Sequence, residues 1–455
     1  MASNWEEMRL DEVTELIIDC PHSTPKWMDE GVVVLRSNNI KNGRLDLSSP
    51  SFTNEEGYQA RVKRAIPESG DLVLTREAPM GEVCQIPEGL RCCLGQRMVL
   101  LRVKKEVMDS RFLLFALQSP YLQHQISWNE GTGTTVSNIR IPNIKAFQIP
   151  TPPFKEQKAI AHTLGCLDDK IELNRQMNET LEAMAQALFK SWFIDFDPVI
   201  DNALAAGNVI PDEFIERAEQ RKGIEKKDNS DIQDLFPDTF EFTEEMGWIP
   251  ESWEVTPLAA LIKLTGGGTP KTSIPEYWNG DIPWFSVVDA PSSSDVFVLD
   301  TEKHVTSLGV ENSSTKILSV GTTIISARGT VGKCAMVSRP MAMNQSCYGV
   351  SGNEGISNTF VYYSVFLSVS ELQSKGHGSV FNTITGDTFK SINVAFSGGR
   401  LTREFDNLVS PYFEKILANS LQVKTLSKLR DTLLPKLMSG ELRIPDAETL
   451  VDEAL

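Results

Sequence analysis

The stretch FKEQKAIAHTLGCLDDKIELNRQMNETLEAMAQALFKSWF, residues 154–193, decides the fold of this chain. Its core positions alternate steps of four and three residues, which is the heptad pattern of a coiled-coil seam. These positions are Ile160, Leu164, Leu167, Ile171, Asn174, Asn178, Leu181, Ala185, Leu188 and Trp192. A helix over about 155–193 would be roughly 58 Å long at 1.5 Å per residue, too long to be packed entirely inside a small domain.

The same spacing returns near the end of the chain. It runs through Phe405, Val409, Tyr412, Ile416, Asn419, Val423, Leu426, Arg430, Leu433 and Leu437. Two equal helices in one chain most simply pack on each other. Asn174 and Asn178 interrupt the first seam, and Asn419 mirrors Asn174. A buried Asn costs stability but fixes register; the alternative is that these side chains point to solvent near a splayed end.

The two helices belong to an internal repeat. Thr24-Pro25-Lys26 recurs 245 residues later as Thr269-Pro270-Lys271, and Gly131-x-Gly133-Thr134 recurs as Gly376-x-Gly378-Ser379. In mid-repeat the offset drifts to 251, which loop insertions explain. The chain is therefore a duplication.

Each repeat begins with a mixed, mostly β module. Short apolar runs at 32–35, 71–74, 98–101 and 322–325 lie between Gly, Pro and Asn turns. One helix per module is expected, at 110–125 and 357–372. The predicted segments are a first module at 1–153, a long helix at 154–193, an acidic linker at 194–247, a second module at 248–399, a long helix at 400–440 and a tail at 441–455.

Composition is that of an ordinary globular protein. The 455 residues are 41% hydrophobic and 23% charged, with a formal net charge of −17. Most of the negative charge lies within 151–250, so elsewhere a basic face is compatible with the total. The linker at 194–247 is expected to be solvated, with short helices; the alternative is an acidic patch that docks a basic partner.

Other classes are disfavoured. No apolar run is long enough for a membrane span, and the N-terminus does not resemble a secretory signal. Seven cysteines without a C-x-x-C pair predict neither a disulfide framework nor a zinc site, and indicate a reduced, cytoplasmic protein. The segment Gly329–Lys333 is too short for a phosphate loop, and Cys334 stands where Ser or Thr is needed. We expect no catalytic centre, metal or cofactor in this chain.

Two similar modules on two long helices suit the recognition of two DNA half-sites at a fixed spacing. Five strings carry a family resemblance: Leu35–Ile40, Ile149–Ile160, Trp192–Pro198, Gly247–Val255 and Leu433–Leu442. On these strings the chain resembles the DNA-specificity subunit of a Type I restriction-modification enzyme. The second repeat departs from the family pattern, because it lacks the Pro-Pro-x-x-Glu-Gln entry to its long helix and has Ser397-Gly398-Gly399-Arg400 instead.

The resemblance implies an α+β protein. Two tandem α/β target-recognition domains would be joined by two long antiparallel coiled-coil helices, with an internal pseudo-two-fold repeat. Its expected partners are double-stranded DNA and two methyltransferase subunits, which use S-adenosylmethionine to methylate adenine after flipping the base. Motor-nuclease subunits that use ATP and magnesium join in systems that cut DNA. A methylation-only or other phage-defence system, and a coiled-coil adaptor that does not touch DNA, stay open as alternatives.

Side-chain chemistry and position indicate the candidate DNA contacts. Arg, Asn, Gln, Ser and Thr on loops suit base edges, and Lys, Arg and small hydroxyls suit phosphates. In the first module the candidates are Thr24, Lys26, Arg36, Asn38, Lys41, Arg76, Arg97, Thr132, Thr134 and Asn138. In the second they are Thr269, Lys271, Arg328, Thr330, Lys333, Gln345, His377, Ser379 and Asn382. The glycine-flanked segments Gly131–Thr135 and Gly376–Ser379 are predicted to be paired loops that contact the duplex; turn-stabilising or plain surface roles are the alternative.

Overall fold

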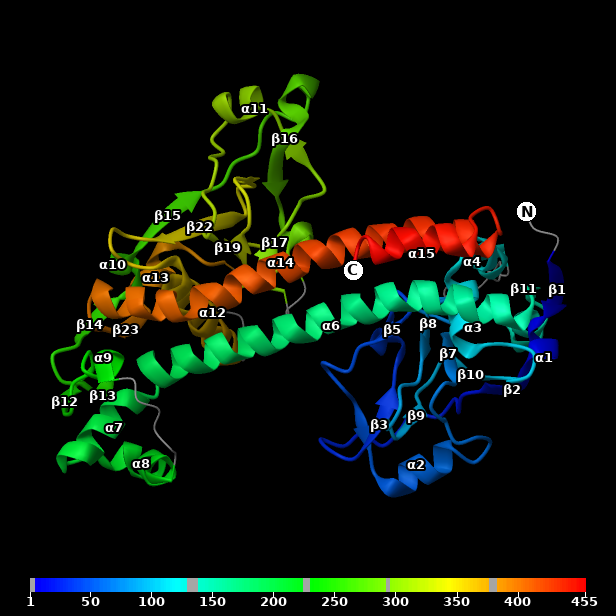
Figure 1. The fold of residues 1–455 in the computed structure, drawn as a ribbon. Helices are drawn as coiled ribbons and strands as arrows, with labels where there is room; N and C mark the ends of the chain where they lie inside the picture. Colours follow the sequence, from blue (N-terminus) through cyan, green and yellow to red (C-terminus); the bar gives the residue numbers. More distant parts are fainter. Residues whose placement is uncertain (1–4, 129–137, 224–229, 292–294, 376–382) are drawn as a thin grey trace. The chain divides into compact units, whose positions relative to one another are not determined.

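A computed structural model describes residues 5–128, 138–223, 230–291, 295–375 and 383–455 (Figure 1). The chain forms two compact units, one of residues 1–172 with 424–455 and one of residues 173–423. Two 40-residue helices, α6 (Phe154–Phe193) and α14 (Gly399–Met438), each contribute residues to both units. Both long helices predicted from the heptad pattern are therefore confirmed. None of the described helices is long and apolar enough to cross a membrane.

The first unit is built on an antiparallel four-stranded sheet of order β2-β10-β7-β8 and a three-stranded sheet of order β6-β3-β9. Its strands are β1 (Glu6–Arg9), β2 (Thr14–Asp19), β3 (Val32–Leu35), β4 (Ile40–Lys41), β5 (Arg44–Leu45), β6 (Phe52–Thr53), β7 (Leu72–Thr75), β8 (Val83–Gln85), β9 (Cys92–Leu94), β10 (Met98–Val103) and β11 (Gln148–Thr151). Its shorter helices are α1 (Leu10–Val13), η1 (Ser37–Asn39), α2 (Glu55–Arg61), α3 (Ser110–Gln118), α4 (Pro120–Trp128), α5 (Ile141–Lys145) and α15 (Ile444–Asp452).

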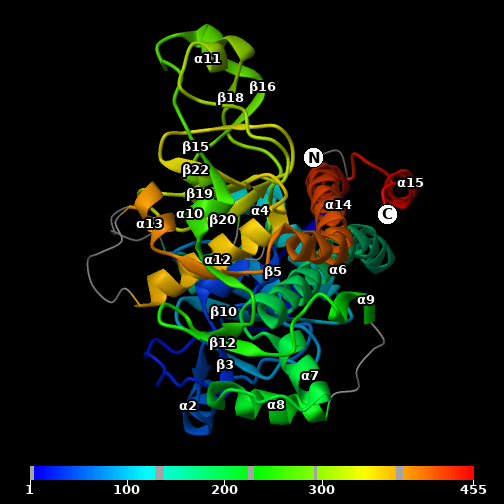
Figure 2. The same cartoon turned by 90° about the vertical axis from the view of Figure 1, so that its left-hand side faces the viewer.

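The second unit has a five-stranded sheet of order β15-β22-β19-β20-β17 and a three-stranded sheet of order β18-β16-β21. Figure 2 shows β16, β18 and α11 together at one end of this unit. Its strands are β12 (Phe240–Thr243), β13 (Gly247–Pro250), β14 (Glu254–Pro257), β15 (Ile262–Gly266), β16 (Trp278–Phe285), β17 (Phe297–Val298), β18 (His304–Val305), β19 (Thr323–Ser326), β20 (Cys334–Val337), β21 (Ala342–Met343), β22 (Cys347–Gly352) and β23 (Asn393–Phe396). Its shorter helices are α7 (Asp197–Ala206), η2 (Asp212–Phe214), α8 (Ile215–Lys222), α9 (Ser230–Gln233), α10 (Leu258–Leu261), η3 (Pro275–Tyr277), η4 (Val287–Asp289), α11 (Ser307–Glu311), α12 (Asn358–Lys375) and α13 (Gly386–Lys390).

The duplication read from the sequence is present in the backbone. Each module pairs two corresponding strands in parallel, β3 with β9 and β16 with β21, and the second module adds a parallel pair of β17 with β20. The Gly95 N–H donates to the Leu35 carbonyl (2.7 Å), and Asn344 donates to Phe285 in the same place (2.9 Å). The Ile139 N–H donates to the Arg76 carbonyl (3.2 Å), and Ile384 donates to Ala327 (2.9 Å). The two modules thus share these loop hydrogen bonds and a common strand order, to which the second module adds the edge strand β17.

The second unit joins its module to the helix pair through an aromatic core. The ring centroids of Phe189 and Phe193 on α6 lie 5.7 Å and 5.6 Å from that of Phe405 on α14. Phe360 of α12 packs against both α6 rings, at 5.7 Å and 5.0 Å. Each such ring pair stabilises the fold by about 0.5–1.5 kcal/mol beyond the stabilisation that comes from burying its apolar surface. The module helix and the two long helices of this unit therefore share one hydrophobic core.

The seam of the helix pair contains buried polar groups. In the second unit Asn178 and Asn419 are 5% and 1% exposed, and the Asn419 Nδ2 donates to the Asn178 Oδ1 (2.9 Å). The buried Asn174 donates to the Gln422 Oε1 (2.8 Å). These side chains do not point to solvent, so that alternative is wrong. The pairing is antiparallel, because positions rise along α6 as their partners fall along α14.

In the first unit, an ion pair lies in the same seam. The Arg430 guanidinium of α14 lies 2.7 Å from the Asp168 carboxylate of α6, and both side chains are largely buried. The remaining seam positions are apolar and buried in their units, except that Leu181, Leu188, Tyr412 and Val423 are partly buried. The predicted seam is therefore the face along which the two helices meet.

Two local expectations differ from the structure. The single helix expected at 110–125 is two helices, α3 and α4, because Pro120 has no N–H for a continuing helix. The segment expected to be a solvated linker is folded into the second unit. Within it, Val199 and Ile200 of α7 are fully buried, and Arg217 holds the Asp197 carboxylate with its Nε at 2.6 Å.

Candidate nucleic-acid interface

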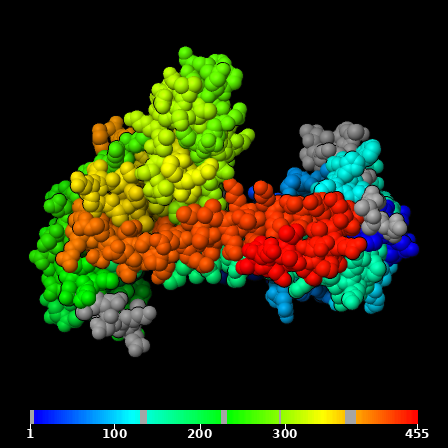
Figure 3. All heavy atoms as spheres, turned by 45° about the horizontal axis from the view of Figure 1, so that its top comes forward, coloured from blue at the N-terminus to red at the C-terminus, as the bar shows by residue number. Residues whose placement is uncertain are grey.

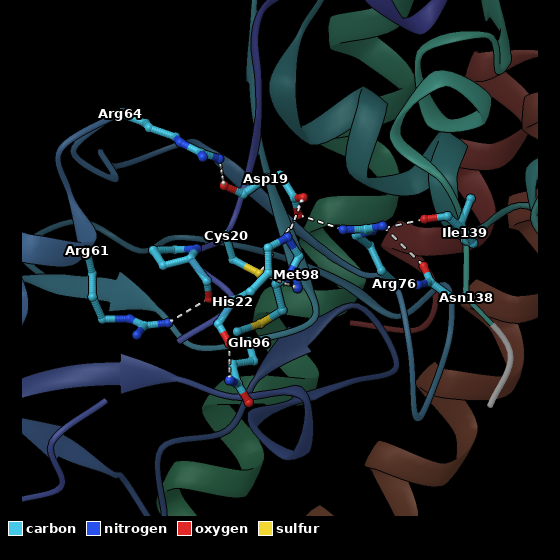
Figure 4. Close-up of polar contacts among 11 residues, drawn as sticks. Asp19, Cys20, His22, Arg61, Arg64, Arg76, Gln96, Met98, Asn138 and Ile139 are labelled. Atoms are coloured by element: carbon cyan, nitrogen blue, oxygen red, sulfur yellow. Dashed lines mark hydrogen bonds and ion pairs between the residues drawn. The ribbon is translucent and has the colours of Figure 1, made fainter. Parts of the chain in front are cut away.

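Five segments of the first unit meet at one end of its four-stranded sheet. They are the loop after β2 (20–27), Arg36 with η1 and β4 (36–41), the loop that joins β7 to β8 (76–82), the loop before β10 (95–97) and the segment that begins at Asn138. Their meeting follows from strand register, since Met98 at the start of β10 pairs with Thr75 at the end of β7, and Val99 pairs with Asp19 at the end of β2. Figure 4 shows polar contacts of the segments that follow β2, precede β10 and begin at Asn138, together with Arg76.

Arg76 was predicted to contact DNA from an exposed loop, and this placement is wrong. Its side chain is buried, with 8% of the residue exposed. Its guanidinium donates to the Asp19 Oδ1 (2.7 Å), the Ile139 carbonyl (2.9 Å) and the Asn138 Oδ1 (3.2 Å) (Figure 4). Arg76 therefore links its own loop to the end of β2 and to the segment that begins at Asn138. The candidate Asn138 is one of its hydrogen-bond partners.

The other described candidates of the first module are exposed. They lie on the five segments and are Thr24, Lys26, Arg36, Asn38, Lys41 and Arg97. The Arg36 guanidinium stacks over the indole of the half-exposed Trp27, 5.3 Å from its centroid. The Arg97 Nε lies 3.3 Å from the Glu77 carboxylate. Arg36 is thus presented by an aromatic face, whereas Arg97 already faces an acidic side chain.

The second module repeats the loop that joins β7 to β8. Gly332 has φ +88° and its N–H donates to the Ser326 carbonyl (2.9 Å); Gly81 has φ +87° and donates to Thr75 (3.0 Å). Because a positive φ suits only glycine well, the two hairpin loops require it at this position. The loop that carries the glycines Gly329 and Gly332 therefore connects two strands, as expected for a segment that is not a phosphate loop.

All described candidates of the second module are exposed. They are Thr269, Lys271, Arg328, Thr330, Lys333 and Gln345. Arg328 and Thr330 lie on the β19–β20 loop, and the Thr269 hydroxyl donates to the Gln345 side chain. The candidates Thr132, Thr134, His377, Ser379 and Asn382, with the segments Gly131–Thr135 and Gly376–Ser379, lie outside the described residues.

The matching loops carry different charges in the two modules. Arg36 corresponds to Ser286, because each precedes a short 3₁₀ turn and donates its N–H to a side-chain oxygen of that turn. The acceptor is Asn39 in the first module and Asp289 in the second. The same correspondence places Glu77 opposite Arg328. One scaffold thus offers a guanidinium at two different places.

Two polar residues at these loops were missed from the sequence. Gln96 matches Gln345 once the offset has drifted to 249, a signal that fixed-offset matching does not find. Arg61 lies on α2 and bonds only main-chain carbonyls, so no sequence pattern identifies its partners.

The His, Cys, Asp and Glu side chains of the described residues bear on metal binding and on thiol chemistry. They include no group of three or more His, Cys, Asp or Glu side chains that could hold a metal ion. Burial raises the pKa of Cys92 to about 12 and that of Cys93 to about 11. These thiols therefore stay protonated near neutral pH and are poor nucleophiles.

Comparisons with known proteins agree with this geometry. The model of a family described as Type I restriction modification DNA specificity domain matches residues 2–183 and 250–396. The HindI specificity subunit of a Type I restriction enzyme from Haemophilus influenzae is 30% identical over 97% of this chain and 100% of its own length. The MjaIX specificity subunit from Methanocaldococcus jannaschii is 26% identical over 83% of this chain and 78% of its own length. A solved Type I S subunit from M. genitalium shares the fold, with a TM-score of 0.55 and 17% identity over 95% of this chain and 96% of that one.

Proposed function

The chain belongs to the Type I restriction-modification DNA-specificity family, and from that premise we propose that it recognises a split DNA site and holds methyltransferase subunits at that site. Each module would serve as a target-recognition domain for one half of the site. The seam of buried polar groups would fix the register of the helix pair.

One observation carries this proposal: two copies of one loop scaffold present different side chains. Arg36 in the first module corresponds to Ser286 in the second, and Arg328 in the second corresponds to Glu77 in the first. A guanidinium binds guanine O6 and N7 in the major groove, whereas Glu accepts from the cytosine N4 amine and Ser can bond donors or acceptors. Two modules with the same backbone and different loop side chains suit two half-sites of different sequence.

We propose that the chain itself is non-catalytic. Methylation of adenine would belong to two partner subunits that bind S-adenosylmethionine and flip the target base. Motor-nuclease subunits with ATP and magnesium would join where the system cuts DNA. The family resemblance supports these partners, and a methylation-only system is the variant that lacks the nuclease.

The long helices offer a surface for such partners. On α6, Leu173, Met177 and Met184 are exposed at heptad spacing, on a face other than the seam. Thr180, Ala183 and Ala187 line a shallow depression beside Met184. On α14, Leu408 and Leu421 are exposed, and the outward face of this helix is uncovered in Figure 3. Apolar side chains at this spacing suit packing against helices of another subunit.

A salt series tests the proposal against an adaptor that does not touch DNA. The chain is purified with its methyltransferase, and binding to a duplex that carries the methylated site is measured by gel shift from 50 to 200 mM salt. A DNA-binding complex loses affinity steeply with salt because counterions are released. Equal, weak binding to this duplex and to an unrelated duplex would contradict sequence recognition and favour the adaptor.

A further inference from the structure

A buried arginine supports the Thr24-Pro25-Lys26 loop from below. Arg61, at the end of α2, is 8% exposed. Its Nη1 donates to the Ser23 carbonyl (2.9 Å), its Nη2 to the Pro21 carbonyl (3.2 Å) and its Nε to the Leu94 carbonyl (2.7 Å). Figure 4 shows the Arg61 side chain directed at the loop that contains His22. One guanidinium thus joins the loop after β2 to the end of β9.

The charge of Arg61 has no carboxylate partner in the part of the chain that the structure describes. Arg76, which also links loop segments, is neutralised by Asp19, whose Oδ1 lies 2.7 Å from the Arg76 Nη1. Arg61 donates only to main-chain carbonyls. A buried cation without a counter-ion is costly, and burial lowers the pKa of Arg61. The same positive charge below an exposed loop favours a phosphate above it.

Gln96 supports the same loop from a second side. Its Nε2 donates to the His22 carbonyl (2.5 Å), one residue before Ser23. Gln96 is partly exposed on the short loop before β10. The carbonyls of Pro21, His22 and Ser23 are therefore all held, while Thr24 and Lys26 are left exposed.

The second module holds its equivalent loop with different donors. The buried Trp284 donates from its indole Nε1 to the Gly268 carbonyl (3.0 Å), and Trp278 donates to the Lys271 carbonyl (3.2 Å). Gln345, the counterpart of Gln96, accepts from the Thr269 hydroxyl. An indole thus occupies in this module the supporting role that a guanidinium has in the first.

We propose that Arg61 and Gln96 are positioning residues for recognition of one DNA half-site, and that Trp284 is the positioning residue for the other. None of the three needs to touch a base, since each fixes the backbone that carries Thr24 and Lys26, or Thr269 and Lys271. This inference rests on the proposed function. It predicts that changes at these residues alter discrimination in one half-site and leave the other unaffected.

The test uses the chain in complex with its methyltransferase. Arg61→Met removes the donors and keeps much of the side-chain volume, and Arg61→Lys restores one donor and the charge. Gln96→Leu changes a partly exposed side chain that holds the same loop, so the proposal can be tested even if Arg61→Met does not fold. Trp284→Phe is the matched control in the other module, because it keeps an aromatic ring and removes the donor. Binding is measured for a duplex that carries the methylated site and for duplexes with single base-pair changes in each half of that site.

The variants of the two modules are expected to affect opposite halves of the site. Arg61→Met and Gln96→Leu should reduce discrimination about fivefold or more in one half only, the lower end of what one bidentate base contact supplies. Arg61→Lys should recover part of it, and Trp284→Phe should act on the opposite half. Unchanged discrimination in both Arg61→Met and Gln96→Leu, or equal loss in both halves, would overturn the inference. If the unaltered complex does not prefer the duplex with the methylated site over an unrelated duplex, the proposed function is overturned instead.

Discussion

The paired asparagines in the seam of the second unit give a prediction that can be worked quantitatively. Asn178→Leu removes the acceptor of the Asn419 amide, which lies at 2.9 Å, and the donor to the Ser420 Oγ at 3.1 Å. Asn419 is 1% exposed, so no solvent replaces the lost partner. Leaving one buried polar group unpaired costs about 1–3 kcal/mol. We therefore expect Asn178→Leu to lower the free energy of unfolding by about that amount.

The double variant separates the cost of an unpaired group from the value of the pair. Asn178→Leu with Asn419→Leu replaces both partners by apolar groups, which is nearly neutral or stabilising in buried sites. The two single effects should therefore fail to add, with an interaction energy of at least about 1 kcal/mol. The same pair also excludes other registers, so the double variant should lose uniqueness of helix pairing before it loses stability.

The assay is urea unfolding followed by tryptophan fluorescence, because Trp192 lies in the core that the seam adjoins. The midpoint is compared at constant slope m, which indicates a change of stability rather than of compactness. Asn407→Leu is the matched control, since Asn407 is exposed on α14 and its change should stay within about 0.5 kcal/mol. Additive single effects, or an Asn178→Leu variant as stable as the unaltered chain, would refute the argument.

Three further predictions concern recognition, assembly and pH. Arg328→Ala should cost about 1–3 kcal/mol of binding and relax one base position, and a uniform loss over all sequences in a binding-site selection would make Arg328 a phosphate contact. Leu181→Asp places a charge at the edge of the aromatic core of the second unit; it should abolish co-purification of the methyltransferase, and a retained complex would contradict the scaffold role. Burial raises the pKa of Glu182, so its stabilising contribution is present at low pH and lost as the pH rises through that raised value. Glu182→Gln should raise the urea midpoint at pH 7 and leave it unchanged below about pH 4, and an equal shift at both pH values would exclude this cause.

The architecture was predictable because periodicity and self-similarity are properties of the sequence itself. A step of four and three residues along 154–193 defines one helix face whatever surrounds it. The repeat offset defines two modules without any knowledge of their topology. Pro120 also predicts, from its missing N–H alone, a break in the helix expected at 110–125.

The support of the loops was not predictable in the same way. Arg76 has its partners 57 and 63 residues away, so its burial depends on how the strands align. An arginine next to a strand end looks the same in sequence whether it points to solvent or to a carbonyl. For the same reason the acidic segment was expected to be solvated, although Arg217 and Arg221 neutralise Asp197 and Asp201. Pairing between distant charges is a product of the fold.

The most direct test of the central claim is a map of methylated adenines across the genome. Cells that express this chain with its methyltransferase are compared with cells that lack this chain alone, and with cells in which residues 1–153 are exchanged for the module of a relative. We expect a split, asymmetric motif that disappears without the chain and changes in one half only on exchange. A map that is unchanged by removal of the chain, or an exchange that alters both halves, would contradict it.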